Sequence, residues 1–259
     1  MDRQAAVAGV FYPEDAQQLH HTLTRYLADA ETDAKVPKAI IVPHAGYLYS
    51  GSVAATAYAR LKKARHLIKR VVIIGPSHRV VFKGLAVSQA ETFSTPLGKI
   101  VVDQEAVETI TQFSFVGYLE QAHAYEHSVE VQLPFLQEML DEFKIVPIVA
   151  GDASAEQVAL VLDTLWGGDE TLLVISSDLS HYHDYATAKQ LDKLTSAHIE
   201  QQQYEQLSVD SACGKVPVSG LLKVAREKSL RIKTIDLRNS GDTAGDKSRV
   251  VGYGAYVIE

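Results

Sequence analysis

The chain has 259 residues, of which 46% are hydrophobic, and its formal net charge is -7. This length and composition can supply one large core, so we predict a single domain over residues 1–259. The net negative charge, and the lack of any basic cluster larger than the scattered one at 62–70, disfavour a nucleic-acid partner. No apolar run approaches the roughly 18 residues that cross a bilayer, and no secretory signal pattern is found, so we expect a cytoplasmic protein.

Helical and extended patterns alternate along most of the chain. Helices are predicted at 15–30, 52–61, 103–112, 128–140, 155–165, 184–202 and 217–226. Asp15 and Asp184 are expected at the starts of the first and sixth of these helices, because aspartate favours a helix N-terminus. Strands are predicted at 39–42, 71–74, 84–88, 100–102, 143–149, 172–175, 230–237 and 250–258. This alternation favours an α/β fold, a three-layer α/β/α sandwich with a largely parallel or mixed central sheet.

Three connections between these elements are predicted in more detail. Gly46 and Gly51 are expected to bracket a turn before the helix at 52–61. The segments 84–88 and 100–102 are expected to form a hairpin that partly covers the functional site. The residues at 113–121 form an aromatic-rich link.

Three of the predicted strands lead directly into loops that carry histidine. Their residues are apolar without alternation, which is typical of strands buried on both faces of a parallel sheet. The loops contribute His44, His78 and His181 respectively. Because ligands of open α/β sheets bind beyond the carboxyl ends of the strands, we expect the three loops to converge on one site.

The residue types in these loops suit a transition metal. Imidazole and thiolate are good ligands for iron, copper or zinc, and Cys213, the only cysteine, precedes the helix predicted at 217–226. A single cysteine also excludes an intramolecular disulfide. The spacing is not that of a zinc finger or an H-E-x-x-H helix, so both a shared metal site and a set of hydrogen-bonding loop histidines stay open.

Two other arrangements are visible near His181. Asp178 precedes it by three residues, and its carboxylate could orient the imidazole and raise its basicity. The alternative is a turn in which Asp178 only accepts hydrogen bonds from backbone amides. Ser77 and Ser177 lie near histidines, but neither lies in a G-x-S-x-G elbow, which disfavours a serine hydrolase.

Six motifs together resemble those of the Memo family. They are Ala8-Gly9-Val10-Phe11-Tyr12-Pro13, Pro43-His44-Ala45-Gly46-Tyr47-Leu48-Tyr49-Ser50-Gly51, Gly75-Pro76-Ser77-His78, Glu126-His127-Ser128-Val129-Glu130-Val131-Gln132-Leu133-Pro134-Phe135-Leu136, Ser177-Asp178-Leu179-Ser180-His181 and Cys213-Gly214. The resemblance implies the LigB-like fold of the class III extradiol dioxygenases, with a cysteine in place of the carboxylate ligand of those enzymes.

The resemblance also implies a site. The metal ligands become His44, His78 and Cys213, and His181, with Asp178 beside it, becomes the catalytic acid/base. Tyr47, His127 and Glu130 lie within the motifs and are expected to contact the substrate or the ligands. A thiolate ligand favours Fe(II) or Cu as the cofactor.

The resemblance therefore implies a metal-binding redox protein, and the activity expected is that of a metal-dependent oxidoreductase of unknown substrate. Its prokaryotic relatives resemble one component of a set with an AMMECR1-like protein and a radical SAM protein. The alternative is a noncatalytic adaptor that binds a small ligand or a peptide in the same pocket. The tyrosines expected at its rim motivate this alternative, because amphipathic rings are good contact residues: Tyr47, Tyr49, Tyr182 and Tyr185.

Overall fold

The computed structural model describes residues 1–30 and 35–259. Its helices are α1 (Ala16–Ala28), α2 (Tyr47–Tyr58), α3 (Gln104–Ile110), α4 (Glu120–Ala124), α5 (Leu133–Met139), α6 (Ala155–Thr164), α7 (Tyr185–Glu200), α8 (Lys215–Glu227) and α9 (Ser240–Thr243), with the short 3-10 helices η1 (Ala59–Ala64), η2 (Glu130–Gln132) and η3 (Tyr204–Gln206). Its strands are β1 (Asp2–Arg3), β2 (Ala39–Val42), β3 (Arg70–Pro76), β4 (Leu85–Val87), β5 (Thr92–Thr95), β6 (Gly98–Val102), β7 (Val116–Tyr118), β8 (Lys144–Ala150), β9 (Thr171–Ser176), β10 (His181–His183), β11 (Ile232–Asn239) and β12 (Val250–Ile258).

All these strands belong to one mixed sheet. Its main path runs β1-β5-β6-β8-β3-β9-β2-β12-β10, with β11 paired to β12 and β4 paired to β7 and β8. The five central strands from β6 to β2 are parallel to one another, whereas β12 runs antiparallel to β2. The carboxyl ends of β2, β3 and β9 therefore lie at the same edge of the sheet.

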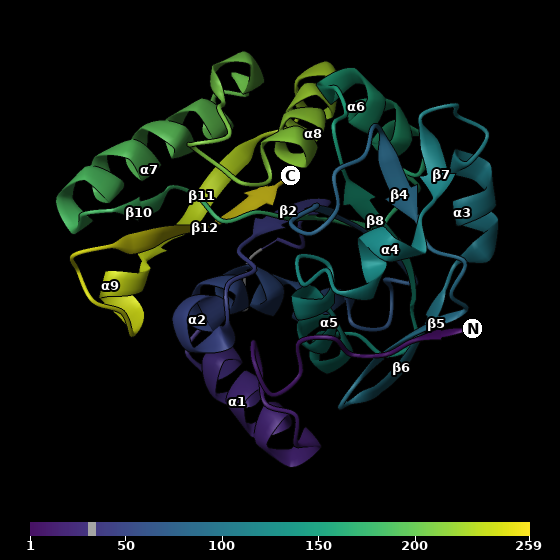
Figure 1. Cartoon of the computed structure of the whole chain (residues 1–259), viewed down its shortest axis with the longest axis horizontal. Helices are drawn as coiled ribbons and strands as arrows, with labels where there is room; N and C mark the ends of the chain where they lie inside the picture. Colours follow the sequence, from purple (N-terminus) through teal and green to yellow (C-terminus); the bar gives the residue numbers. More distant parts are fainter. Residues whose placement is uncertain (31–34) are drawn as a thin grey trace.

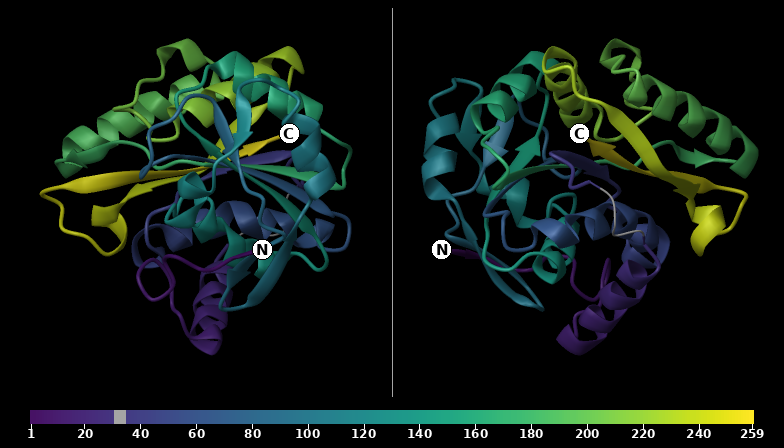
Figure 2. Two further views of the ribbon diagram at one scale, coloured as in Figure 1. Left: turned by 45° about the vertical axis from the view of Figure 1, so that its right-hand side comes forward. Right: turned by 180° about the vertical axis from the view of Figure 1, so that it is seen from behind.

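Helices cover both faces of this sheet (Figures 1 and 2). On one face α6 packs against α8, which contacts β3 and β9, and α7 packs against β11 and β12. On the other face α2 contacts α1, α5 and β2. The predicted three-layer α/β/α sandwich is confirmed. No helix within residues 1–30 and 35–259 is long and apolar enough to cross a membrane.

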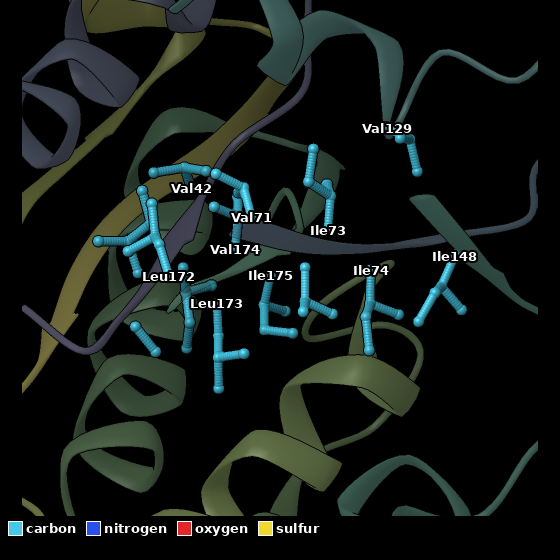
Figure 3. Close-up of a cluster of buried hydrophobic side chains, with 14 of the residues drawn as sticks. Val42, Val71, Ile73, Ile74, Val129, Ile148, Leu172, Leu173, Val174 and Ile175 are labelled. Atoms are coloured by element: carbon cyan, nitrogen blue, oxygen red, sulfur yellow. The ribbon is translucent and has the colours of Figure 1, made fainter. Parts of the chain in front are cut away.

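The core lies at the centre of the sheet. Every residue of β2 and β9, and every residue of β3 after Arg70, is buried. Apolar side chains from β2, β3, β8 and β9 pack together in Figure 3. Each fully buried isoleucine, leucine or valine contributes about 1.5–3 kcal/mol. This core fixes the strand ends from which the loop side chains project.

Several predicted helices and their start signals are confirmed. Asp15 caps α1 by accepting a hydrogen bond from the Gln18 amide. Asp184 caps α7 by accepting from the amides of Ala186 and Thr187. Helix α6 begins at Ala155, as predicted.

The prediction for α2 was wrong at both ends. The helix begins at Tyr47, five residues before the predicted start, and ends at Tyr58, where η1 continues the chain. Gly51 lies inside the helix and does not bracket a turn. A Cβ at Gly51 would lie 2.7 Å from the Tyr26 ring of α1, so glycine is needed here for close helix packing.

The predicted hairpin between 84–88 and 100–102 was also wrong. The strand β6 pairs with β5, and their connection contains Pro96. The strand β4 instead pairs with β8 and with β7. Strand β7 lies within the segment predicted to be only an aromatic link.

Candidate metal centre

His44, His78 and Cys213 come together at the carboxyl edge of the sheet. One donor atom from each side chain lies within 4.8 Å of the other two. The rings of His44 and His78 meet edge to face, with centroids 5.1 Å apart. His44 follows β2, His78 follows β3 and Cys213 precedes α8, so the fold brings together the three side chains predicted as metal ligands.

The hydrogen bonds of Ser176 fix the protonation of the His44 ring. The Ser176 hydroxyl donates to the Ser128 carbonyl oxygen, 2.6 Å away. Its oxygen therefore accepts from His44 Nδ1, at 2.9 Å, and Nδ1 carries the ring hydrogen. Burial, with the nearby His78 and His127 rings, holds the pKa of His44 well below its usual range. The ring is thus neutral, with the lone pair of Nε2 available to a metal.

Glu126 fixes His78 in the same way. The Glu126 carboxylate accepts from His78 Nδ1 at 2.9 Å and from the His78 amide at 2.6 Å. It also accepts from the backbone amides of His127 and Ser128. Burial opposes ionisation of Glu126, but these hydrogen bonds prevail and lower its pKa to about 2. The carboxylate is therefore an acceptor, which leaves His78 Nε2 free of hydrogen when the ring is neutral.

Cys213 reaches the two histidines because the next residue is glycine. A Cβ at Gly214 would lie 2.7 Å from the carbonyl oxygen of Ser176, so only glycine lets this loop approach the end of β9 so closely. The sulfur lies 3.2 Å from His44 Nε2 and accepts from the Asp178 amide at 3.3 Å. Burial and the nearby Asp178 carboxylate raise the pKa of the thiol to about 12. The thiol is therefore protonated at neutral pH.

Asp178 contacts His44 and does not orient His181 as proposed from the sequence. Its carboxylate accepts from the His44 amide at 2.8 Å and lies 4.0 Å from His44 Nε2. Burial raises the pKa of this carboxyl group, and the hydrogen bond from the His44 amide opposes the rise. His181 is held by a backbone group, since its Nδ1 lies 2.8 Å from the Leu179 carbonyl oxygen. The alternative reading, a turn in which Asp178 accepts from backbone amides, describes its hydrogen bonds better.

A cleft of about 720 Å³ opens onto this cluster between α7 and the segment that leads to α8. Its lining includes His78 and Cys213 of the cluster, together with His181. Because the Leu179 carbonyl accepts from Nδ1 of His181, that nitrogen carries a ring hydrogen and Nε2 makes no bond to Leu179. A larger hollow, about 910 Å³, lies near Lys69 and Lys144 at the amino ends of β3 and β8 and takes no part in the site.

Of the three residues predicted to contact the substrate or the ligands, only His127 lies beside the cluster. The His127 ring stacks on His78 with centroids 4.5 Å apart and meets His44 edge to face, so it lies directly beside the cluster. Tyr47 is buried and donates to the Val131 carbonyl, so it belongs to the core and is not among the residues that line this cleft. Glu130 is also buried, and its partners are Arg3, Tyr12 and the amides of Ala6 and Val7. It anchors the N-terminal segment and does not contact the ligands.

The sequence pattern predicts no role for Glu126 or Ser176, the two residues that fix the ring hydrogens. Glu126 lies within one of the Memo-like motifs, and its position beside His127 is its local signal. Ser176 is the last residue of β9 and follows an apolar run, where a serine is easily taken for a strand end.

Comparisons with known proteins all identify the same family. A family model described as "Memo-like protein" matches residues 3–257. The chain is 38% identical over 263 residues to a "MEMO1 family protein" of Aquifex aeolicus, with 97% of each chain covered. It is 37% identical over 272 residues to a "MEMO1 family protein" of Methanosarcina acetivorans, with 99% of each covered. A relative of the same description from Thermoplasma acidophilum is 32% identical over 266 residues.

Proposed function

The chain belongs to the Memo-like protein family, as its motifs predicted, and from this premise we propose that it is a metal-dependent redox protein with His44, His78 and Cys213 as ligands. The observation that carries the proposal is the protonation pattern of the two histidines. In each ring Nδ1 is engaged by a fixed acceptor, Ser176 or Glu126, and Nε2 is left for a metal. Metal-binding histidines typically have such a partner on the second ring nitrogen.

The donor set favours particular metals. Two neutral imidazoles and one soft thiolate suit Fe(II) or Cu better than Mg or Ca, which prefer carboxylate oxygens. A metal of this kind supplies one-electron chemistry and a binding position for a substrate oxygen. The chain's own residues then orient the ligands and move protons, with His181 Nε2 as the proton acceptor in the cleft. We also propose that the chain is related to the class III extradiol dioxygenases.

Metal binding by purified variants tests this function. The metal-free protein is titrated with Fe(II) under anaerobic conditions and with Cu, beside His44→Ala, His78→Ala and Cys213→Ser. We expect one metal per chain and loss of tight binding in all three variants. The exposed His21 lies on α1, so His21→Ala is the matched control and should bind as the parent does. Unchanged metal stoichiometry in all three ligand variants would refute the assignment.

Activity is a separate measurement. Oxygen consumption with dihydroxylated aromatic compounds is measured on metal-loaded protein and on His181→Ala. Turnover that depends on His181 would support an enzymatic function. Bound metal without turnover would favour a noncatalytic protein that binds its ligand in the same cleft.

A further inference from the structure

A buried network of hydrogen bonds extends from Nδ1 of His44 into the core. Its side chains are Ser176, Gln132 and Tyr58, each at most 1% exposed. We propose that Gln132 is a positioning residue of the metal centre, which holds His44 so that the ring presents only Nε2 to a metal. The inference rests on the proposed function, because it concerns how a ligand of the same site is held.

The Gln132 amide group contacts both the backbone and the ring partner of His44. Its Nε2 donates to the Pro43 carbonyl oxygen at 2.9 Å and to the Ser176 hydroxyl oxygen at 2.9 Å. Pro43 is the residue before His44, and Ser176 accepts from the His44 ring. One side chain therefore holds the chain that leads into the ligand and the acceptor that fixes its ring.

The neighbours of Gln132 allow its amide only one orientation. The Pro43 carbonyl can only accept a hydrogen bond, so the nitrogen of the amide must face it. On the other side the Tyr58 hydroxyl donates to Gln132 Oε1 at 2.9 Å. The Tyr58 ring is stacked on Phe135, with centroids 4.9 Å apart. A reversed amide would bring two oxygens together at Pro43, so Nε2 stays directed at Ser176.

Ser176 has no hydrogen-bonding capacity left. A hydroxyl group has one hydrogen to donate and two lone pairs to accept with. Ser176 donates to the Ser128 carbonyl oxygen and accepts from Gln132 and from His44. Buried polar networks in which every group is satisfied are rigid. The ring hydrogen of His44 therefore stays on Nδ1, and Nε2 is the nitrogen that a metal can reach.

The two histidine ligands are held in different ways. His78 is held by the ionised carboxylate of Glu126, whereas no side chain of the His44 network carries a charge. Removing a member of this network therefore changes how firmly the ring is held and leaves the charge of the site as it was. Tyr58 at the end of α2 and Gln132 in η2 act on His44 from elements that supply no ligand.

NMR of the metal-free protein, labelled with ¹⁵N at histidine, observes the ring hydrogen of His44 directly. A buried, hydrogen-bonded N–H exchanges slowly with water, and His44→Ala identifies this signal by its absence. We expect this hydrogen to exchange about tenfold faster in Gln132→Met than in the parent. The His123 ring bonds to the Ala86 carbonyl oxygen elsewhere in the core, so its signal is an internal control and should not change.

Metal affinity supplies the second measurement, by competition of Fe(II) with a chelator under anaerobic conditions. We expect Ser176→Ala to lower the affinity about 10–100-fold, Gln132→Met about tenfold and Tyr58→Phe about threefold. The order follows because each substitution lies one hydrogen bond further from the ring. Gln137 bonds to Thr95 and lines the hollow at the amino ends of the strands, so Gln137→Met is the matched control and should bind as the parent does.

The outcomes separate this inference from the metal assignment. An unchanged His44 signal in Gln132→Met, or parent-like metal affinity of that variant, would overturn the inference. If Gln132→Met disturbs His123 as well, Tyr58→Phe decides: a change confined to His44 supports the inference, and a change in both signals or in neither overturns it. If the parent binds neither Fe(II) nor Cu while the His44 signal depends on Gln132, the positioning of the ring stands and the proposed function fails.

Discussion

The sulfur of Cys213 lies 3.2 Å from Nε2 of His44, although 169 residues separate the two in the chain. The thiol is buried beside the Asp178 carboxylate, and the His44 ring is kept neutral by burial. The pair is therefore a protonated thiol next to a neutral imidazole. This state differs from the thiolate–imidazolium pair of a cysteine nucleophile, and under the proposed function it becomes a ligand pair when a metal displaces the thiol proton.

Metal affinity should depend on pH because the thiol of Cys213 must lose its proton. Its pKa is raised to about 12, so the proton competes with the metal throughout the neutral range. We expect the apparent affinity to rise about tenfold per pH unit between pH 7 and 9, with about one proton released per metal. Calorimetry in two buffers of different ionisation enthalpy measures the proton count. In Cys213→Ser the pH slope should vanish, and a pH-independent affinity of the parent would contradict the ligand role.

Glu126→Gln should weaken metal binding without changing the ligands themselves. The carboxylate holds both the ring and the backbone of His78. Loss of such a partner typically costs about 10–100-fold in metal affinity. The measurement is a competition titration against a chelator. Glu120 accepts from Ser88 and the Gln89 amide in another part of the chain, so Glu120→Gln is the control and should leave the affinity unchanged.

The role of Glu130 is expected to be structural. It forms a buried ion pair with Arg3, whose guanidinium also donates to the carbonyls of His123 and Glu126. Glu130→Ala should lower the free energy of unfolding by about 3–5 kcal/mol, because it leaves a buried charge without its partner. The double variant Arg3→Met/Glu130→Met should lose less free energy of unfolding than Glu130→Ala, because it leaves no buried charge unpaired.

Urea denaturation and metal titration of the same samples separate stability from binding. The control is the exposed pair of Glu205 and Arg226, where solvent screens the two charges and Glu205→Ala should leave the free energy of unfolding nearly unchanged. Folded Glu130→Ala protein that no longer binds metal would contradict the structural role and return Glu130 to the site.

His123 should make the fold sensitive to acid. Burial lowers its pKa from 6.5 to about 4, against the opposing effect of the hydrogen bond to the Ala86 carbonyl. The unfolded chain therefore takes up this proton first, and stability is lost as pH falls from 6.5 to 4, by up to about 3 kcal/mol. His123→Gln should flatten the acid branch of a denaturation series, whereas His21→Gln should not. If the free energies of unfolding of the parent and of His123→Gln fall equally as the pH is lowered, His123 is not the cause of the acid sensitivity.

The elements built from local signals were predictable. Unalternated apolar runs identified β2, β3 and β9, and Asp15 and Asp184 marked the helix starts they cap. Because parallel strands share an edge, the meeting of His44 with His78 also followed from the pattern.

The features that depend on distant contacts were not predictable. Gly51 resembles a turn residue until Tyr26 of another helix is found against it. Tyr47 resembles a rim residue because its burial depends on the packing of α2 against α5. Glu126 acts on His78, 48 residues away, and no spacing rule links a carboxylate to a histidine at that separation.

The separation of 169 residues between His44 and Cys213 also determines when, during synthesis of the chain, both side chains are present. At about 5–20 residues per second, a ribosome needs roughly 8–34 s to add the thiol after the first histidine has been made. A nascent chain can expose both imidazoles during that interval but cannot complete the three-donor set. Tight metal loading would then be a late event, and bound metal would mark chains whose synthesis has passed Cys213.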